Sequence, residues 1–231
     1  MPFKRALTII SILLSTINCV AQQNIEKKNR LTNQVIERFY VQPDNQQIKD
    51  GPYHAFFRRR VVVAEGNYTK GKRSGTWHFY NTKGALFQTY NFDKDSLEFE
   101  GRERVATDFH YLVDKEISDT DRVTKPVKIG GRYYGFLPYL GVYKTPFDVY
   151  QSSGFFVAQI ELLISPLGRL AEYKVRLVSP ILEIDQTVTL SLNFFNEDDK
   201  KFIPATINYK PVLSRIFIKC RVTEDGELDF Y

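Results

Sequence analysis

The sequence RSGTWHFYN, residues 73–81, places a glycine, a tryptophan, a histidine and two further aromatic residues within a few positions. Residues 49–57, KDGPYHAFF, repeat the same order of residue types 24 positions earlier. Short aromatic runs separated by turns rich in Gly, Asn, Asp and Lys are typical of β-hairpins. A repeated hairpin cannot bury its apolar face alone, so this recurrence predicts neighbouring hairpins stacked into a small elongated sheet.

The equivalent positions of the two units have structural roles in this interpretation. The glycines serve turns, because glycine tolerates a positive φ. Tyr53 and Trp77 are expected to stack across strands, and His54 and His78 to lie on one row of the sheet. A metal site needs three or four converging donors, and no Cys, Asp or Glu recurs beside these histidines. We therefore predict scaffold rather than metal ligands at both histidines.

The second unit contains a series of short motifs at fixed spacing: Gly66-Asn67-Tyr68, Lys70-Gly71-Lys72, Gly75-Thr76-Trp77, Phe79-Tyr80 and Lys83-Gly84. With these motifs, residues 35–92 resemble the MORN-like repeats of the YwqK family, whose unit is rich in Gly, Tyr and Trp. The first unit departs from that pattern, because Tyr53 replaces the Trp and residues 57–60, FRRR, replace the glycine-bearing turn. The resemblance implies a β-hairpin repeat sheet and says little about function.

The N-terminus has the pattern of a targeting segment. Lys4 and Arg5 precede an apolar stretch, residues 6–17, that is short for a membrane span and typical of a signal-peptide core. We expect residues 1–21 to be a signal peptide, followed by a polar lead-in at 22–34. Two alternatives stay open: a lipid anchor on Cys19 and an uncut membrane anchor. Each of them predicts an exported protein of the periplasm or envelope.

Charge and cysteine content exclude some classes of protein. The 231-residue chain has a formal charge of +5, which falls to +3 when the two basic residues of the signal peptide are removed. That excess is too small to indicate a nucleic-acid partner. After cleavage Cys220 is the only cysteine, so no internal disulfide is expected, and its alternating sequence context predicts a buried structural thiol.

The remainder divides into a charge-rich connector at residues 93–125 and a second domain. The central part of the connector has the alternative of forming an extra strand on either neighbour. In the second domain, residues 155–164 and 170–180 alternate and are separated by a turn, which predicts a β-hairpin. Residues 212–222 predict a further strand, and residues 181–195 fit a strand or a helix.

A second set of motifs runs through residues 126–223. Its members are Gly130-Gly131, Phe136-Leu137, Tyr143-Lys144-Thr145-Pro146, Gly154-Phe155, Gly168, Val175 to Pro180, Phe202-Ile203-Pro204-Ala205 and Lys210-Pro211-Val212. In this order they resemble the C-terminal domain of TonB-family proteins. This resemblance implies a small α+β domain at residues 126–231, with a helix at 181–195. A TonB energy transducer keeps an N-terminal membrane helix and a Pro-rich spacer, and neither is evident in this sequence.

No motif indicates catalysis. The sequence lacks a Gly-rich phosphate loop and a nucleophile elbow, its three histidines lack ligand spacing, and the acidic run Glu197-Asp198-Asp199 is typical of a solvated loop. We expect no enzyme activity, no cofactor and no metal. The expected function is that of an exported protein-binding module whose partner is a protein of the cell envelope, such as an outer-membrane protein.

Strand addition is the binding mode that the sequence favours. Leu213 to Val222 is expected to form an edge strand whose unpaired backbone groups capture an extended, acidic peptide. Its outward face carries the predicted binding residues Arg215, Phe217, Lys219 and Arg221. The same charges would also serve merely to keep an edge soluble. The alternatives are energy transduction to an outer-membrane transporter, if residues 1–21 stay uncut, and lipid or glycan binding by the repeats.

Overall fold

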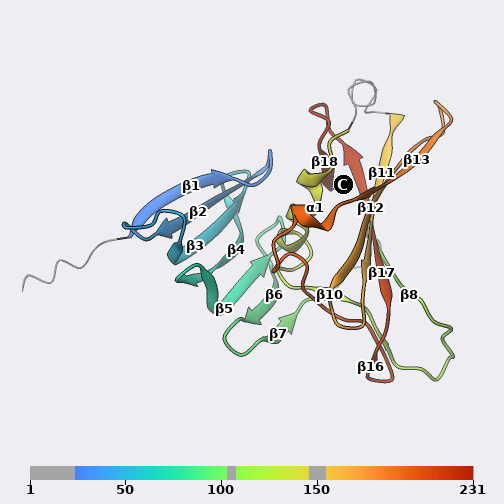
Figure 1. Ribbon diagram of the computed structural model, residues 1–231, viewed down its shortest axis with the longest axis horizontal. Coiled ribbons are helices and arrows are strands. Elements are labelled where there is room, and N and C mark those ends of the chain that lie inside the picture. The colour runs from blue at the N-terminus through green and yellow to red at the C-terminus, as the bar shows by residue number, and fades with distance from the viewer. Residues whose placement is uncertain (1–23, 103–107, 146–154, 231) are drawn as a thin grey trace, which may run out of the picture.

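The computed structural model describes residues 24–102, 108–145 and 155–230, and Figure 1 shows two antiparallel β-sheets lying side by side. Among these residues the one α-helix is α1, Leu137–Val142. The fold is therefore mainly β and built from antiparallel hairpins, as the aromatic runs predict for residues 35–92, whereas the α+β architecture expected at residues 126–231 stays a prediction. No helix within the described ranges is long and apolar enough to cross a membrane.

The first sheet is a meander in which each strand pairs with its neighbours in the sequence, in the order β1 to β7. Such pairing needs only short turns, which the Gly-, Asn- and Lys-rich segments provide. The strands are β1 (Ile25–Arg30), β2 (Val35–Val41), β3 (Lys49–Phe57), β4 (Val61–Thr69), β5 (Lys72–Tyr80), β6 (Leu86–Asn91) and β7 (Ser96–Glu100).

The repeated aromatic positions form the core of this sheet, as predicted. Tyr53 and Trp77 are both fully buried, with ring centroids 5.1 Å apart. The Trp77 ring lies flat on the backbone at Gly66, where an added Cβ would come within 2.3 Å of the indole. Its Nε1 donates a hydrogen bond to the carbonyl of Asn67 at 3.1 Å. The glycine of the repeat unit thus makes room for the tryptophan.

The two repeat histidines lie on one row of the sheet, as predicted, with a carboxylate between them. His54 faces Glu65 across β3 and β4, and Glu65 faces His78 across β4 and β5. The Glu65 carboxylate is 3.9 Å from Nδ1 of His78 and accepts a hydrogen bond from the Tyr80 hydroxyl at 2.5 Å. The row faces away from the buried aromatic rings, because neighbouring residues of a strand point to opposite faces.

The second sheet has a non-sequential order, β13-β12-β11-β17-β18, with β8 also paired to β17. The hairpin predicted at residues 155–180 is present as β11 and β12. The strands of this sheet are β8 (Phe109–Val113), β11 (Val157–Ile164), β12 (Leu170–Ser179), β13 (Ile184–Leu190), β17 (Ser214–Val222) and β18 (Leu228–Phe230). The short elements around it are β9 (Val123–Thr124), β10 (Val127–Lys128), η1 (Tyr134–Phe136), η3 (Leu192–Phe194), β14 (Phe202–Ile203), β15 (Thr206–Ile207) and β16 (Lys210–Pro211).

The prediction of a helix at residues 181–195 is wrong. This segment forms strand β13, paired along its length with β12, followed by the 3-10 turn η3. Thr187 and Thr189 have low helix propensity, and Val188 and Leu190 alternate with them toward the core, so the local signals favoured a strand. The expectation of a helix came from the family resemblance alone.

Residues 93–125 contribute strands to both sheets. β7 closes the first sheet beside β6, and β8 pairs with β17 in the second sheet. The alternative of an extra strand on a neighbour thus describes the central part of this segment. The signal peptide expected at residues 1–21 lies outside the described residues.

Residues 128–140 lie between the two sheets (Figure 1), and buried polar contacts attach them to the first sheet. The fully buried amide of Gln88 on β6 accepts hydrogen bonds from the backbone N–H groups of Gly130 and Gly131 at 2.8 and 2.9 Å, and donates one to the Lys128 carbonyl at 3.1 Å. The hydroxyls of Tyr53 and Tyr134 lie 2.7 Å apart. One hydrophobic cluster therefore runs from the first sheet into the second.

Candidate functional site

The strand predicted to be an edge is an interior strand. β17 pairs with β11 along one side, from Ser214 to Arg221. On its other side β8 pairs with residues 214–218 and β18 with residues 220–222, while the N–H of Lys219 donates to the carbonyl of Asp108 at 2.8 Å. The prediction of an open edge at residues 213–222 is therefore wrong. β8 and β18 follow one another along the side that was expected to be free.

The alternation predicted for this strand is confirmed. Ile216, Ile218 and Cys220 are fully buried, whereas the side chains of the predicted binding residues, Arg215, Phe217, Lys219 and Arg221, point to the opposite face.

The arginines of the predicted set already have acidic partners inside the chain. Arg215 forms ion pairs with Asp114 and Glu161, and Arg221 pairs with Asp229 at 2.7 Å. These carboxylates come from the neighbouring strands of β17, so the arginines neutralise their own sheet. A binding role for the four residues stays a prediction. The charges of Arg215 and Arg221, however, are already neutralised by carboxylates of the same chain and attract an acidic peptide less strongly.

The free edge on the opposite side of the sheet is β13. It pairs with β12 over seven residues, from Ile184↔Ser179 to Leu190↔Tyr173, and no other described strand pairs with it. In Figure 1 it runs from the hairpin tip at the upper right toward the centre of the molecule. Val188 and Leu190 are half-buried on the core side, and the other residues of the strand are exposed. The sequence interpretation missed this edge because it assigned the segment to a helix.

Edge strands are normally kept from pairing with another chain by charged side chains, by proline or by their short length. β13 has little of this protection. Its sequence IDQTVTL holds one charged residue, Asp185, whose carboxylate is bound by Arg176 at 2.7 Å. The edge strand β1, IEKKNR, carries four charged side chains, and β7 carries two in five residues. β8 lacks charge but spans only five residues. Among the described edges, β13 therefore offers the longest and least protected ladder.

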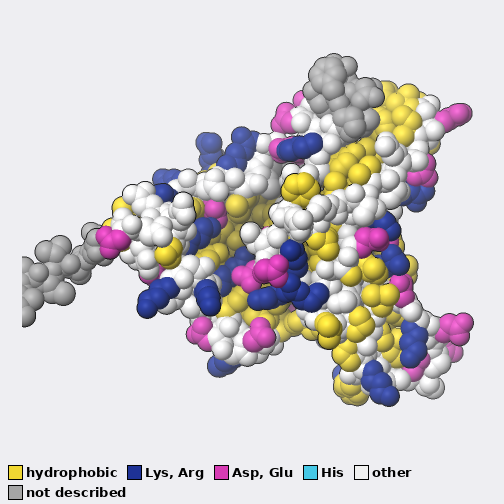
Figure 2. Space-filling model, in the orientation of Figure 1, with side chains coloured by type: hydrophobic (Ala, Val, Ile, Leu, Met, Phe, Trp, Pro, Cys, Tyr) yellow, Lys and Arg dark blue, Asp and Glu magenta, His cyan; other side chains and the backbone are white. Residues whose placement is uncertain are grey.

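Exposed apolar residues adjoin this edge. Ile181 and Leu182 in the β12–β13 turn are 70% and 45% exposed, and Ile184 at the start of β13 is 36% exposed. Figure 2 shows apolar side chains gathered over the upper right part of the second sheet. The turn therefore extends the apolar surface of the sheet beyond its last strand.

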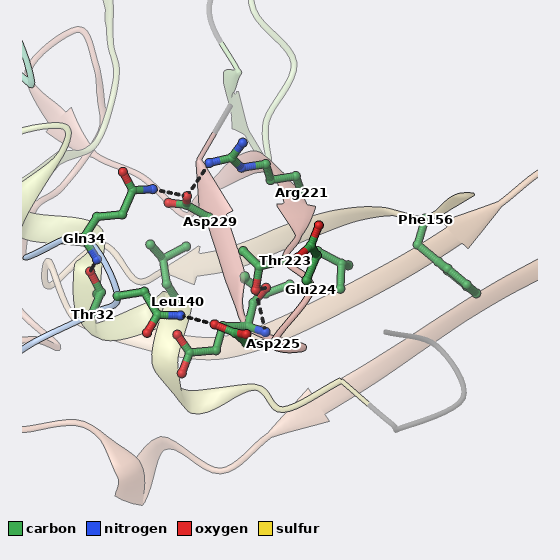
Figure 3. A pocket seen from close by; sticks show the side chains of 13 residues that line it. Thr32, Gln34, Leu140, Phe156, Arg221, Thr223, Glu224, Asp225 and Asp229 are labelled. Atoms are coloured by element: carbon green, nitrogen blue, oxygen red, sulfur yellow. Dashed lines mark hydrogen bonds and ion pairs between the residues drawn. The ribbon is translucent and has the colours of Figure 1, made fainter. Parts of the chain in front are cut away.

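A cleft of about 630 Å³ lies between the β1–β2 turn and the β17–β18 hairpin (Figure 3). Gln34 and Arg221 point toward Asp229 from either side, and both bind its carboxylate. Asn33 donates to Asp225 at 2.8 Å. The polar groups of this cleft thus join the two sheets to each other. Arg221 from the predicted set lies here.

The other reactive side chains are dispersed. No group of three or more His, Cys, Asp or Glu side chains in the described part of the chain converges as a metal site would require. Cys220 is fully buried, as predicted, and burial raises the pKa of its thiol to about 12. Burial also raises the pKa of the Tyr53 and Tyr134 hydroxyls, so both stay protonated and one donates its hydrogen bond to the other.

No protein-family model, curated protein or solved structure matches this chain.

Proposed function

We propose that the protein is a non-enzymatic binding module of the bacterial cell envelope that adds an extended segment of a partner protein to β13. This moves the strand-addition site from β17, whose two sides are both paired, to the opposite edge of the same sheet. The single observation that carries the proposal is the seven-residue, nearly uncharged edge of β13. Export, and with it the envelope location, rests on the targeting pattern of residues 1–21.

Strand addition supplies affinity through backbone hydrogen bonds and specificity through alternate side chains. On the core side, the partner would cover Val188 and Leu190, which are only half-buried, and near the turn it would cover Ile184. On the outer side it would meet Thr187 and Thr189, which are exposed. The preferred segment therefore alternates apolar residues with Thr, Ser or other small polar residues, and it needs no strong acidic charge.

The resemblance of residues 126–223 to TonB C-terminal domains supports an envelope partner. The first sheet would then act as a rigid support, because Gln88 and Tyr53 fix it to residues 128–134. Binding by this sheet is not needed in the proposal. Its edge β1 carries Lys27, Lys28 and Arg30, which oppose pairing with another strand.

The test is site-specific photo-cross-linking in the native host, with the photoreactive residue at Thr189. The supporting result is one cross-linked segment of one partner protein, located by mass spectrometry, that is lost in a Gln186→Pro chain. Proline at the edge removes a backbone donor and blocks regular pairing there. Melting curves must show that Gln186→Pro remains folded.

The matched control places the photoreactive residue at Lys28 on β1 and the proline at Lys27. Equal cross-linking from Lys28, or cross-linking from Thr189 that survives Gln186→Pro, contradicts strand addition to β13. A cross-link from Thr189 to the same position of a second copy overturns the assignment of a partner protein and indicates an edge-to-edge dimer instead.

A further inference from the structure

A groove of about 390 Å³ lies where the first sheet meets residues 128–138 and the 194–199 loop. This volume is within the range of small-molecule sites, which form preferentially where two packed units meet. Its polar wall holds Lys49, Tyr68, Arg73 and Tyr134, and its apolar wall includes Leu137 and Phe194.

Arg73 on β5 is the cation of this groove that has no ion-pair partner among the described residues, although its charge acts on the nearby Asp198 carboxylate. Its guanidinium carbon lies 5.1 Å from the ring centroid of Trp77 and 5.4 Å from that of Phe92. Its Nε donates one long hydrogen bond, 3.5 Å, to the Tyr68 hydroxyl. No described Asp or Glu lies within ion-pairing distance of this half-buried guanidinium. The remaining N–H donors of its planar fork have no hydrogen-bond acceptor among the described residues.

The other cations of the groove are committed to partners. Nζ of Lys49 forms an ion pair with Glu37 at 2.8 Å. Nζ of Lys128 donates to the backbone carbonyls of Asp198, Asp199 and Lys201 at 3.1, 2.6 and 3.1 Å. The lining contains three basic side chains, Lys49, Arg73 and Lys128, against two acidic ones, Glu37 and Asp199. Burial lowers the pKa of Lys128 to about 7, so Arg73 is the cation of the lining that stays charged and has no ion-pair partner among the described residues.

We propose that this groove binds a small carboxylate with an apolar, ring-bearing body. An arginine fork packed against two aromatic rings is pre-organised for a planar carboxylate, which it binds through two parallel hydrogen bonds. The Tyr68 hydroxyl lies beside the guanidinium and is placed to share one carboxylate oxygen. The apolar body packs against Leu137 and Phe194, of which Phe194 is 67% exposed.

The site is independent of strand addition, because its charged group lies on the first sheet and not on β13. It also differs from the cleft in Figure 3, where Asp225, Glu227 and Asp229 already have amide, lysine or arginine partners. A ligand in the groove would contact the first sheet and residues 128–138 together, and would thereby strengthen their attachment to each other.

Trp77 is the only tryptophan of the chain and contacts Arg73 directly, so its fluorescence reports binding at this site. The experiment titrates the folded protein with 3-phenylpropionate and, as a neutral probe of the same shape, 3-phenylpropionamide. Calorimetry gives the affinities without relying on the fluorophore. We expect saturable binding of the carboxylate, with affinity about tenfold or more above that of the amide, as loss of one charge-assisted contact implies.

Arg73→Gln should reduce carboxylate affinity to that of the amide, and Arg73→Lys should restore part of it, because lysine keeps the charge without the fork. The matched control is Lys72→Gln, the same change of charge at the exposed neighbouring residue, which should bind as the unaltered chain does. Melting curves must show that all variants are folded.

Absent saturable binding of the carboxylate, equal binding of the amide, or full affinity in a folded Arg73→Gln chain would each overturn the proposal. Tighter binding of phenyl phosphate than of the carboxylate would overturn the assignment of a carboxylate.

Discussion

The two sheets of this protein differ in how far apart in the sequence their paired strands lie. In the first sheet every strand pairs with the next one along the chain. In the second sheet β17 pairs with β11 and also with β8, which lies about a hundred residues earlier in the sequence than β17. Their edges differ too, because β1 is strongly charged and β13 is nearly uncharged. The first sheet thus resists addition of another strand, and the second sheet has an edge that permits it.

The largest expected effect comes from proline within β17. Phe217 pairs with Glu161 on one side and His110 on the other, so Phe217→Pro disrupts the centre of the second sheet. We expect a loss of about 3 kcal/mol or more of unfolding free energy. Lys27→Pro on edge strand β1 should cost about 1 kcal/mol or less. Chemical denaturation followed by circular dichroism measures both, and equal stability of the two variants would contradict the interior position of β17.

Trp77→Ala tests the core of the first sheet. Removing this fully buried ring should cost about 3–5 kcal/mol of unfolding free energy. Gly66→Ala should also destabilise, by about 1–3 kcal/mol, because its Cβ meets the indole. Once Trp77 is alanine, the added methyl at position 66 should cost little. Additive costs in the double variant would show that the two residues do not contact each other.

Gln88→Met tests the junction between the sheets. It leaves the buried N–H groups of Gly130 and Gly131 without acceptors and should cost about 1–3 kcal/mol. Hydrogen exchange at these two amides should become faster. The control Gln42→Met removes one half-buried hydrogen bond to Asp50 and should leave the junction amides unchanged. Unchanged hydrogen exchange at Gly130 and Gly131 in Gln88→Met would show that Gln88 does not hold these two amides.

The smallest expected effect concerns Cys220, measured in a Cys19→Ser chain. Burial raises its pKa to about 12, above its ordinary value of 9.0, so iodoacetamide at pH 8 should modify the thiol only after unfolding. Because the folded pKa is the higher one, the associated stability is complete below pH 9 and is lost as pH rises toward 12. Cys220→Ala should lose stability less steeply in that window. Rapid modification of the folded chain would contradict the buried position.

The sequence was sufficient to predict buried positions and strand faces where these depend on neighbouring residues alone. The 24-residue recurrence predicted the buried pair Tyr53 and Trp77 and the common row of His54 and His78, because a hairpin repeat fixes which positions face inward. The same holds for the alternation that buries Cys220. The error at residues 181–195 arose where a family resemblance outweighed Thr187 and Val188, whose propensity favours a strand.

The candidate sites could not be predicted because they depend on long-range pairing. Whether residues 213–222 form an edge is decided by residues 109–113, which cover them from a segment expected to be a connector. The groove at Arg73 depends on how residues 128–138 pack onto the first sheet, and no local pattern reports that packing. The acidic partners of Arg215, at positions 114 and 161, are equally invisible before the fold is known.

The most direct test of this account is residue-resolved hydrogen exchange by NMR on the isolated chain. If β13 is the free edge, alternate amides of residues 184–190 should exchange rapidly, because they point away from β12. The amides of residues 214–222 should be protected throughout, since β17 has partners on both sides. Rapid exchange of alternate amides in β17, together with uniform protection of β13, would contradict the account.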